Sequence, residues 1–170
     1  MSALRTQELH QIFLNSLASV VLWHSDIHRK PLDINLKLPH PPRIRGYLYN
    51  LVKSSGIRRR NEYKIVLRVP RQIQGEYGSF EYPVDRLVIL CGYREDLNIF
   101  VFWDAYLHQR FKWGGNIQIK SRTVFEALLG EIVIQSRNLT SGHTELVLAT
   151  PACRVLDCLQ QRLEASILGR

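Results

Sequence analysis

The residues best suited to chemistry in this chain are basic, and they are concentrated between positions 40 and 72. This segment carries nine Lys and Arg residues against one acid, Glu62, so its charge equals the formal net charge of +8 of the whole chain. Its basic residues are Arg43, Arg45, Lys53, Arg58, Arg59, Arg60, Lys64, Arg68 and Arg71. A local excess of positive charge attracts polyanions, of which nucleic acid is the commonest in a cell. The segment predicts a nucleic-acid-binding surface; the alternative is a solvated run of charge.

Three consecutive arginines, Arg58–Arg60, are the densest part of this segment. They follow Ser54-Ser55-Gly56, so we expect them on a flexible loop before a strand at 63–69. Apolar and polar residues alternate in that strand, which places Lys64 and Arg68 on one face. Arginines on such a loop can reach phosphates or pair with guanine in the major groove, and we expect Arg43 and Arg45 to add phosphate contacts.

A second candidate region is the aromatic and polar segment 103–113. Its candidate base-contacting residues are Trp103, Asp104, His108, Arg110 and Lys112. Aromatic faces stack on bases, and a carboxylate accepts a hydrogen bond from the amino edge of a base. The alternative, which we favour for the aromatic residues, is that Trp103 and Phe111 belong to the core and Asp104 caps a turn.

A third candidate is the polar face of a predicted strand at 116–120. Asn116, Gln118 and Lys120 point to one side, with Ile117 and Ile119 on the other. Asn and Gln are the side chains that pair bidentately with adenine, so this face could read bases. The alternative is an edge strand with a solvated polar face.

A nuclease site is a further reading of the same residues. Restriction nucleases of the PD-(D/E)xK class resemble a pattern of an acid followed by D/E-x-Lys, with carboxylates that hold Mg²⁺. Here Gln118 and Lys120 would act with Asp104 or Asp96. Glu62 and Lys64 would act with Asp33 as a second candidate set. Gln is a poorer ligand than a carboxylate for a hard cation, which weakens the nuclease interpretation. We expect no cofactor for DNA binding, and Mg²⁺ if the chain is a nuclease.

The elements that must position these residues are mostly strands. We expect helices at 5–23, at 124–129 and after Pro151, the second with Thr123 and Glu126 as a capping box and Gly130 as its end. Residues 24–42 look irregular, and 43–53 form a short helix or strand. The predicted strands are 63–69, 86–91, 98–103, 116–120, 131–136 and 144–149. This order predicts an α+β fold: a mainly antiparallel twisted sheet or open barrel with helices at both ends.

The length of 170 residues suits one domain, which we divide into a lead-in at 1–39, a β-rich core at 40–150 and a C-terminal helix at 151–170. No apolar run reaches the roughly 18 residues of a membrane span, and no signal peptide opens the chain. The three cysteines, Cys91, Cys153 and Cys158, lack the CxxC spacing of a zinc site. We expect reduced thiols, no metal site, and a cytoplasmic protein.

The order of motifs over roughly residues 40–150 resembles a family. The arginine loop is followed by Glu62-Tyr-Lys-Ile65, Gly75-Glu-Tyr-Gly-Ser-Phe80, Arg86-Leu-Val-Ile-Leu-Cys-Gly-Tyr93, Phe100-Val-Phe-Trp-Asp-Ala105, His108, Asn116-Ile-Gln-Ile-Lys120 and Glu145-Leu-Val-Leu-Ala149. This is similar to the methylase-associated or restriction-endonuclease-associated domains of bacterial restriction–modification systems.

The resemblance implies a module that recognises double-stranded DNA, with a pseudobarrel or SRA-like fold and a modified base as one target. It also implies a separate nuclease or methyltransferase subunit as partner, and a homodimer is compatible with it. It carries over no catalytic residue, because no nuclease signature matches position by position. A third class, an interaction module whose basic surface meets an acidic protein, is the remaining alternative.

Overall fold

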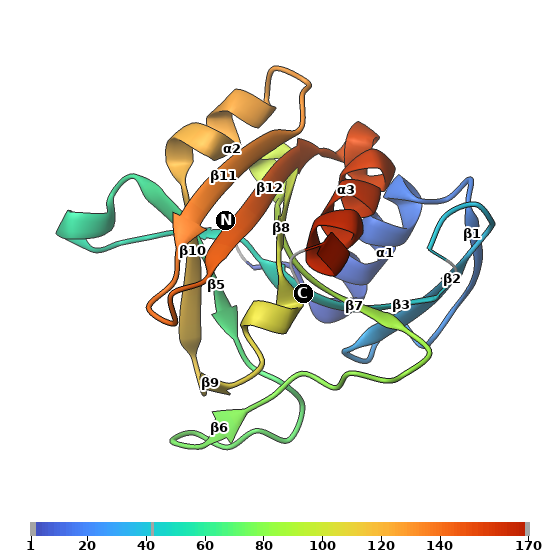
Figure 1. Ribbon diagram of the computed structural model, residues 1–170, viewed down its shortest axis with the longest axis horizontal. Helices are drawn as coiled ribbons and strands as arrows, with labels where there is room; N and C mark the ends of the chain where they lie inside the picture. Colours follow the sequence, from blue (N-terminus) through green and yellow to red (C-terminus); the bar gives the residue numbers. More distant parts are fainter. Residues whose placement is uncertain (1–2, 42, 169–170) are drawn as a thin grey trace.

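The structure is a computed structural model that describes residues 3–41 and 43–168. A twisted seven-stranded sheet runs through it in the order β1-β2-β3-β7-β8-β12-β11 (Figure 1). Its strands are β1 (Val21–His24), β2 (Leu32–Leu36), β3 (Arg43–Asn50), β7 (Leu87–Arg94), β8 (Ile99–Trp103), β12 (Thr144–Pro151) and β11 (Val133–Asn138). Only the β3–β7 pair is parallel among these described strands. The prediction of an α+β fold with a mainly antiparallel sheet is confirmed.

A smaller three-stranded sheet carries the predicted binding residues. It has the order β10-β5-β4, with β10 at Gly115–Lys120, β5 at Glu62–Leu67 and β4 at Val52–Lys53. The remaining pair consists of β6 (Tyr77–Gly78) and β9 (Phe111–Lys112). Three α-helices complete the described chain: α1 (Thr6–Ser16), α2 (Ser121–Ala127) and α3 (Val155–Leu168). The short 3-10 helices are η1 (Ile57–Arg59), η2 (Glu95–Leu97), η3 (Ala105–Leu107) and η4 (Ala152–Arg154).

The large sheet separates two hydrophobic cores, because successive residues of each strand face opposite sides. On one side Phe100 and Phe102 of β8 meet Phe13 of α1, in a core that α3 also covers. On the other side Val101 and Trp103 pack with residues of the small sheet and α2. The molecule is therefore a layer of two helices, a central sheet, and a second layer formed by the small sheet and α2 (Figure 1).

Glycine at position 92 permits the two sheets to pack closely. A Cβ atom there would lie 2.7 Å from Cγ2 of Ile65 on the small sheet and 3.2 Å from Cζ3 of Trp103 on β8. Real Cβ atoms essentially never come as close as the first distance, so any side chain at this position would push the sheets apart. The position of the small sheet is thus set by a packing constraint on β7.

Side chains connect the small sheet to the edge of the large one. Oε1 of Gln135 on β11 accepts a hydrogen bond from the backbone N–H of Lys120 at 2.9 Å. Nη1 of Arg137, also on β11, donates to the carbonyl oxygen of Gln118 at 2.8 Å. These contacts fix β10 beside β11 without a backbone ladder, so the described strands form no closed barrel.

Several predicted boundaries were wrong. The first helix ends at Ser16, and residues 21–24 form the edge strand β1 instead. The segment expected to be irregular contains β2, where Leu32, Ile34 and Leu36 face the helix-side core. Residues 43–53 are strands, of which β3 is the longer. Over the described part of the chain, no helix combines the length and apolar composition needed to cross a lipid bilayer.

The second helix is also different in detail. It begins at Ser121 with Lys120 as its N-cap residue, so Thr123 lies inside it and forms no capping box. The hydroxyl of Thr123 instead donates to Oε1 of Gln135 at 2.9 Å. Gly130, with φ of +97°, follows the helix as predicted.

Candidate nucleic-acid interface

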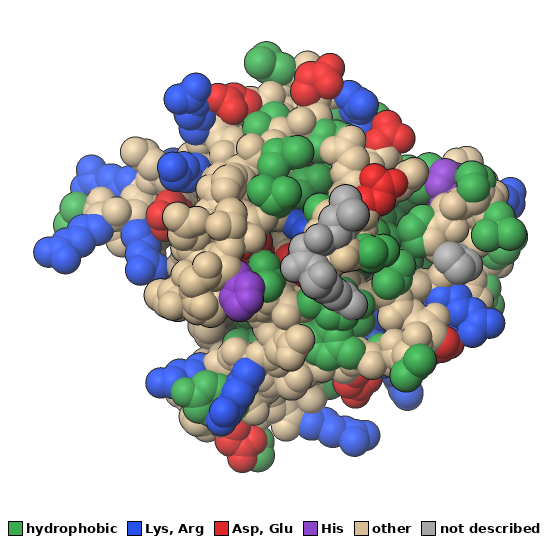
Figure 2. Space-filling view, in the orientation of Figure 1, with side chains coloured by type: hydrophobic (Ala, Val, Ile, Leu, Met, Phe, Trp, Pro, Cys, Tyr) green, Lys and Arg blue, Asp and Glu red, His purple; other side chains and the backbone are tan. Residues whose placement is uncertain are grey.

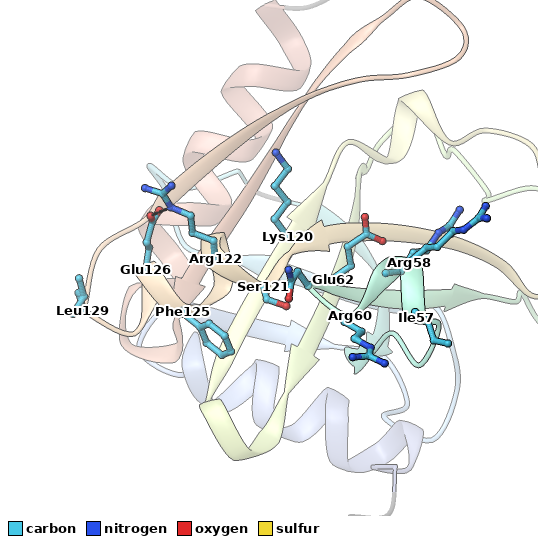
Figure 3. Close-up of a pocket in the computed structure, with 12 residues that line it drawn as sticks. Ile57, Arg58, Arg60, Glu62, Lys120, Ser121, Arg122, Phe125, Glu126 and Leu129 are labelled. Atoms are coloured by element: carbon cyan, nitrogen blue, oxygen red, sulfur yellow. Dashed lines mark hydrogen bonds and ion pairs between the residues drawn. The ribbon is translucent and has the colours of Figure 1, made fainter.

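An open groove of about 860 Å³ lies between the loop that joins β4 to β5 and helix α2 (Figure 3). The loop carries the arginine triplet, and the groove also includes the ends of β5 and β10. Its lining residues are Ile57, Arg58, Arg59, Arg60, Asn61, Glu62, Lys120, Ser121, Arg122, Phe125, Glu126 and Leu129. The predicted loop and the predicted polar strand therefore meet at one site.

Strand pairing explains why these segments come together. β5 and β10 are antiparallel, with Lys120 opposite Glu62 and Gln118 opposite Lys64. The base of the loop is closed by hydrogen bonds from Ser54 N to Glu62 O at 2.9 Å and from Ser121 N to Asn61 O at 2.7 Å. The loop is anchored at both ends, and its tip projects from the body of the molecule (Figure 1).

The groove has a marked excess of unpaired positive charge. Across residues 3–41 and 43–168, no ion pair or side-chain hydrogen bond engages the charged groups of Arg58, Arg59, Arg60 or Lys120. Arg122 pairs with Glu126, with 2.6 Å between Nε and Oε1. Blue side chains gather on the projection at the left of Figure 2, which is the β4–β5 loop of Figure 1. Four cations at one surface are thus available to an external anion.

An aromatic side chain lies in the same groove. Phe125 extends from α2 toward the side of the arginine loop, and 47% of the residue is exposed (Figure 3). Its ring packs edge to face with Tyr63, with 6.1 Å between centroids and an angle of 90°. Sequence reasoning did not identify Phe125, because the apolar residues of a short predicted helix do not show which of them faces a groove.

A polar row continues from the groove along the outer face of the small sheet. Residues directly opposite each other in an antiparallel pair share a face. Lys120, Gln118 and Asn116 of β10 therefore lie on the same face as Glu62 and Lys64 of β5, as their alternating exposure also shows. The predicted alternation of both strands is confirmed.

Beyond this row, three further candidates lie over aromatic rings. The guanidinium of Arg68 stacks on Trp113, with 3.9 Å from Cζ to the ring centroid. Arg110 lies over Tyr77 at 4.2 Å, and Lys112 lies 5.9 Å from the same ring. These side chains remain at the surface but are partly ordered by cation–π contacts.

Two arginines at the start of the basic segment belong to ion pairs of the fold. Arg45 forms a bidentate pair with Asp33, at 2.8 and 2.9 Å, and a third contact with Glu81 at 2.7 Å. These bonds raise the pKa of Arg45, and its side chain is only 19% exposed. Arg43 pairs with Asp85 at 2.9 Å. The expectation that both supply free charge for phosphates is corrected by these carboxylates, which lie outside the basic segment.

The region 103–113 contributes mainly to the interior. Trp103 is fully buried, and its indole N–H donates to the carbonyl oxygen of Gln118 at 3.3 Å. Phe111 is also in the core, and Oδ1 of Asp104 accepts from the N–H of Tyr106 as the cap of η3. The alternative interpretation is confirmed: Trp103 is buried, and the carboxylate of Asp104 is engaged by the N–H of Tyr106 and by Arg162. The prediction that these two residues contact bases was wrong for that reason.

A buried ionic network surrounds His108. Its Nε2 lies 2.8 Å from Oε1 of Glu145, a carboxylate with no solvent exposure that also accepts from the N–H of Asp104. Arg137 lies 3.5 Å from the other oxygen of Glu145, and Arg162 lies 3.3 Å from Asp104. Burial lowers the pKa of Arg162. His108 thus holds the fold together, whereas the sequence suggested a surface contact.

Four of the nuclease candidates, Gln118, Lys120, Glu62 and Lys64, share one face of the small sheet, but the acids predicted to act with them are held in ion pairs. Asp104 is paired with Arg162 inside the molecule, whereas Gln118 and Lys120 lie on the outer face of the small sheet. The other candidate acids are also engaged by arginines, Asp33 by Arg45 and Asp96 by Arg94. Within the described residues, no three His, Cys, Asp or Glu side chains gather as metal ligands. A metal at either proposed set would first require these ion pairs to break.

Comparison with known proteins adds a family to this geometry. A family model described as methylase-associated X1 matches residues 42–159, well over half of the chain. No curated protein and no solved structure matches the chain at a significant level. The matched range contains the whole small sheet, the arginine loop and α2. The chain therefore belongs to the methylase-associated X1 family, a domain of the kind associated with restriction–modification systems.

Proposed function

We propose that this protein is a double-stranded DNA-binding module that works beside the methyltransferase of a restriction–modification system. The proposal rests on four unpaired cations that line the same groove: Arg58, Arg59, Arg60 and Lys120. Arginines displayed on a projecting loop suit phosphate contacts, which supply most of the affinity for DNA. The family supports the association with a methyltransferase.

Sequence readout in this proposal falls to the polar row of the small sheet. Asn116 and Gln118 carry the amides that pair with adenine, and Lys64 lies directly opposite Gln118. The row starts at Lys120, which also lines the groove, so a duplex held by the arginines has base-contacting groups beside it. Phosphate contacts then fix the position of the duplex, and the amides distinguish its bases, including a methylated adenine.

The direct test is binding to a 20-base-pair duplex, measured by fluorescence anisotropy at 50 and 200 mM salt. We expect binding that weakens steeply with salt, because each neutralised phosphate releases counterions. Binding that does not change with salt would contradict the proposal. A parallel incubation with plasmid and Mg²⁺ tests for cleavage, which the proposal does not require.

Readout is tested with the variant Gln118→Ala. The 118 side chain is partly exposed on the outer face, while its backbone carbonyl holds Trp103 and Arg137, so the substitution leaves those bonds in place. We expect selection among duplexes of randomised sequence, with and without adenine methylation, to be lost while affinity for bulk DNA remains. Arg29→Ala, far along the chain in the β1–β2 connection, serves as the control.

A further inference from the structure

The groove presents both cationic and apolar side chains, and a fully paired duplex offers a partner only for the cations. Its walls carry the cations of the arginine loop, but the residues that line it also include three exposed apolar side chains, Ile57, Phe125 and Leu129. A duplex presents phosphates and base edges, whereas the flat faces of its bases are covered by stacking. Cations alone would therefore leave the apolar part of the groove in water.

We infer that the groove takes an unpaired nucleotide of the DNA, with its base stacked on Phe125 and its phosphates held by the arginine loop. This inference rests on the proposed function and names the form of DNA that the same site prefers. An aromatic face beside basic side chains is the arrangement that binds unpaired bases, since every base offers a flat π-face. A volume of about 860 Å³ is within the usual range of small-molecule sites and has room for one nucleotide.

The geometry of Phe125 suits this role. Its edge-to-face contact with Tyr63 fixes the ring, so little freedom is lost when a base stacks on it. Arg60 lies across the groove on the loop side, whereas Arg122, on α2 itself, is paired with Glu126 (Figure 3). Unpaired positive charge therefore lies on the loop side of the ring, where a phosphate next to an unpaired nucleotide would pass.

Helix α2 offers a closely matched control. Leu128 follows Phe125 by three positions and has the same exposed fraction, 47%, but it does not line the groove. Phe125→Ala and Leu128→Ala therefore remove similar exposed apolar surface from the same region, inside and outside the site. Phe125→Leu keeps an apolar contact with Tyr63 and removes only the aromatic face, which guards against misfolding as an explanation.

The experiment compares a fully paired 20-base-pair duplex with the same duplex carrying one extra, unpaired 2-aminopurine at its centre. We expect the wild-type protein and Leu128→Ala to bind the bulged duplex more tightly and to change its 2-aminopurine emission. Phe125→Ala should bind the bulged duplex roughly 5- to 150-fold more weakly, the range for loss of one stacked base, and Phe125→Leu should fall between. The affinity of Phe125→Ala for the paired duplex should fall much less than its affinity for the bulged duplex.

The outcomes separate this inference from the proposed function. If the wild-type protein binds both duplexes equally with steep salt dependence, DNA binding stands and the inference fails. The inference also fails if Phe125→Ala and Leu128→Ala weaken binding alike. If the wild-type protein binds neither duplex, both the inference and the proposed function are overturned.

Discussion

Removing the arginine triplet should reduce the salt dependence of DNA binding by an amount that the structure sets. In the triple variant Arg58→Ala, Arg59→Ala and Arg60→Ala, three of the four unpaired cations of the groove are lost. For B-form DNA the slope of log affinity against log salt is about −0.9 per neutralised phosphate. Four contacts give a slope of about −3.6, and the one left in the variant gives about −0.9.

These slopes predict a large difference in measured affinity. From 50 to 200 mM salt, wild-type affinity should fall about 150-fold, whereas that of the triple variant should fall only about 3.5-fold. Other cations that touch DNA, such as Lys64, would steepen both slopes equally. The change in slope, about 2.7, is therefore the quantity that tests the site.

A charge-matched control distinguishes the groove from the net charge of the protein. Arg5, Arg29 and Arg154 each form an ion pair with a nearby carboxylate, at 2.9, 3.6 and 2.7 Å respectively. Their replacement by Ala also removes three positive charges, and exposed pairs of this kind contribute little to stability. We expect the slope of this control to stay close to that of the wild-type protein.

The assay is fluorescence anisotropy of a labelled duplex over a salt series, with thermal unfolding to verify that each variant is folded. The side chains of all three arginines are exposed and lack partners among the described residues. The free energy of unfolding of the triple variant should therefore lie within about 0.5 kcal/mol of the wild-type value. A change in slope below about 1 for the triplet, or an equal change for the control, would refute the assignment of phosphate contacts to this loop.

Three further predictions concern the body of the fold. Burial lowers the pKa of His10 to about 4, so the free energy of unfolding should decrease as pH falls from 6.5 toward 4. In His10→Asn this decrease, measured by urea unfolding, should be smaller by on the order of 2–3 kcal/mol, and an equal decrease in both proteins would contradict the prediction. Glu145→Gln should lower the free energy of urea unfolding by about 1–3 kcal/mol, because it disturbs the buried contact with His108. Glu131→Gln, in an exposed ion pair, should change this free energy by about 0–1 kcal/mol, and equal changes in the two variants would argue against a stabilising buried network. Ellman's reagent should modify only Cys153 in the native protein and all three cysteines in urea, because Cys91 and Cys158 are buried and burial raises the pKa of their thiols. Rapid labelling of a second thiol in the native protein would contradict this prediction.

The sequence predicted strands well where alternation was clear. The periods of two at 63–69 and 116–120 located β5 and β10 and assigned their faces, because local side-chain direction is enough for that. The same pattern exists in β2, where Leu32, Ile34 and Leu36 alternate with polar residues. The prolines on either side of this segment favour irregular structure, although a proline next to a strand does not prevent the strand from pairing.

The groove depends on information that no local pattern contains. The register between β5 and β10 places Lys120 beside Glu62, and this pairing joins segments more than fifty residues apart. The position of α2, and with it Phe125, follows from the packing of β10 against β11 through Gln135. Sequence reasoning could name the arginines and the polar strand, but it could not show that an aromatic side chain faces them.

Only part of the positive charge of residues 40–72 is unpaired in the folded protein, and the unpaired part identifies the region that can bind an anion. Asp33, Glu81 and Asp85 lie outside residues 40–72 in the sequence, yet their carboxylates form ion pairs with Arg43 and Arg45 at the start of this segment. If the excess charge served only to keep the protein in solution, such pairing would have no reason to stop at β3. The unpaired cations instead lie on the loop after β4 and at the end of β10, beside an exposed phenylalanine. Phosphate and base contacts should therefore depend on that end of the small sheet, and β3 should contribute stability alone.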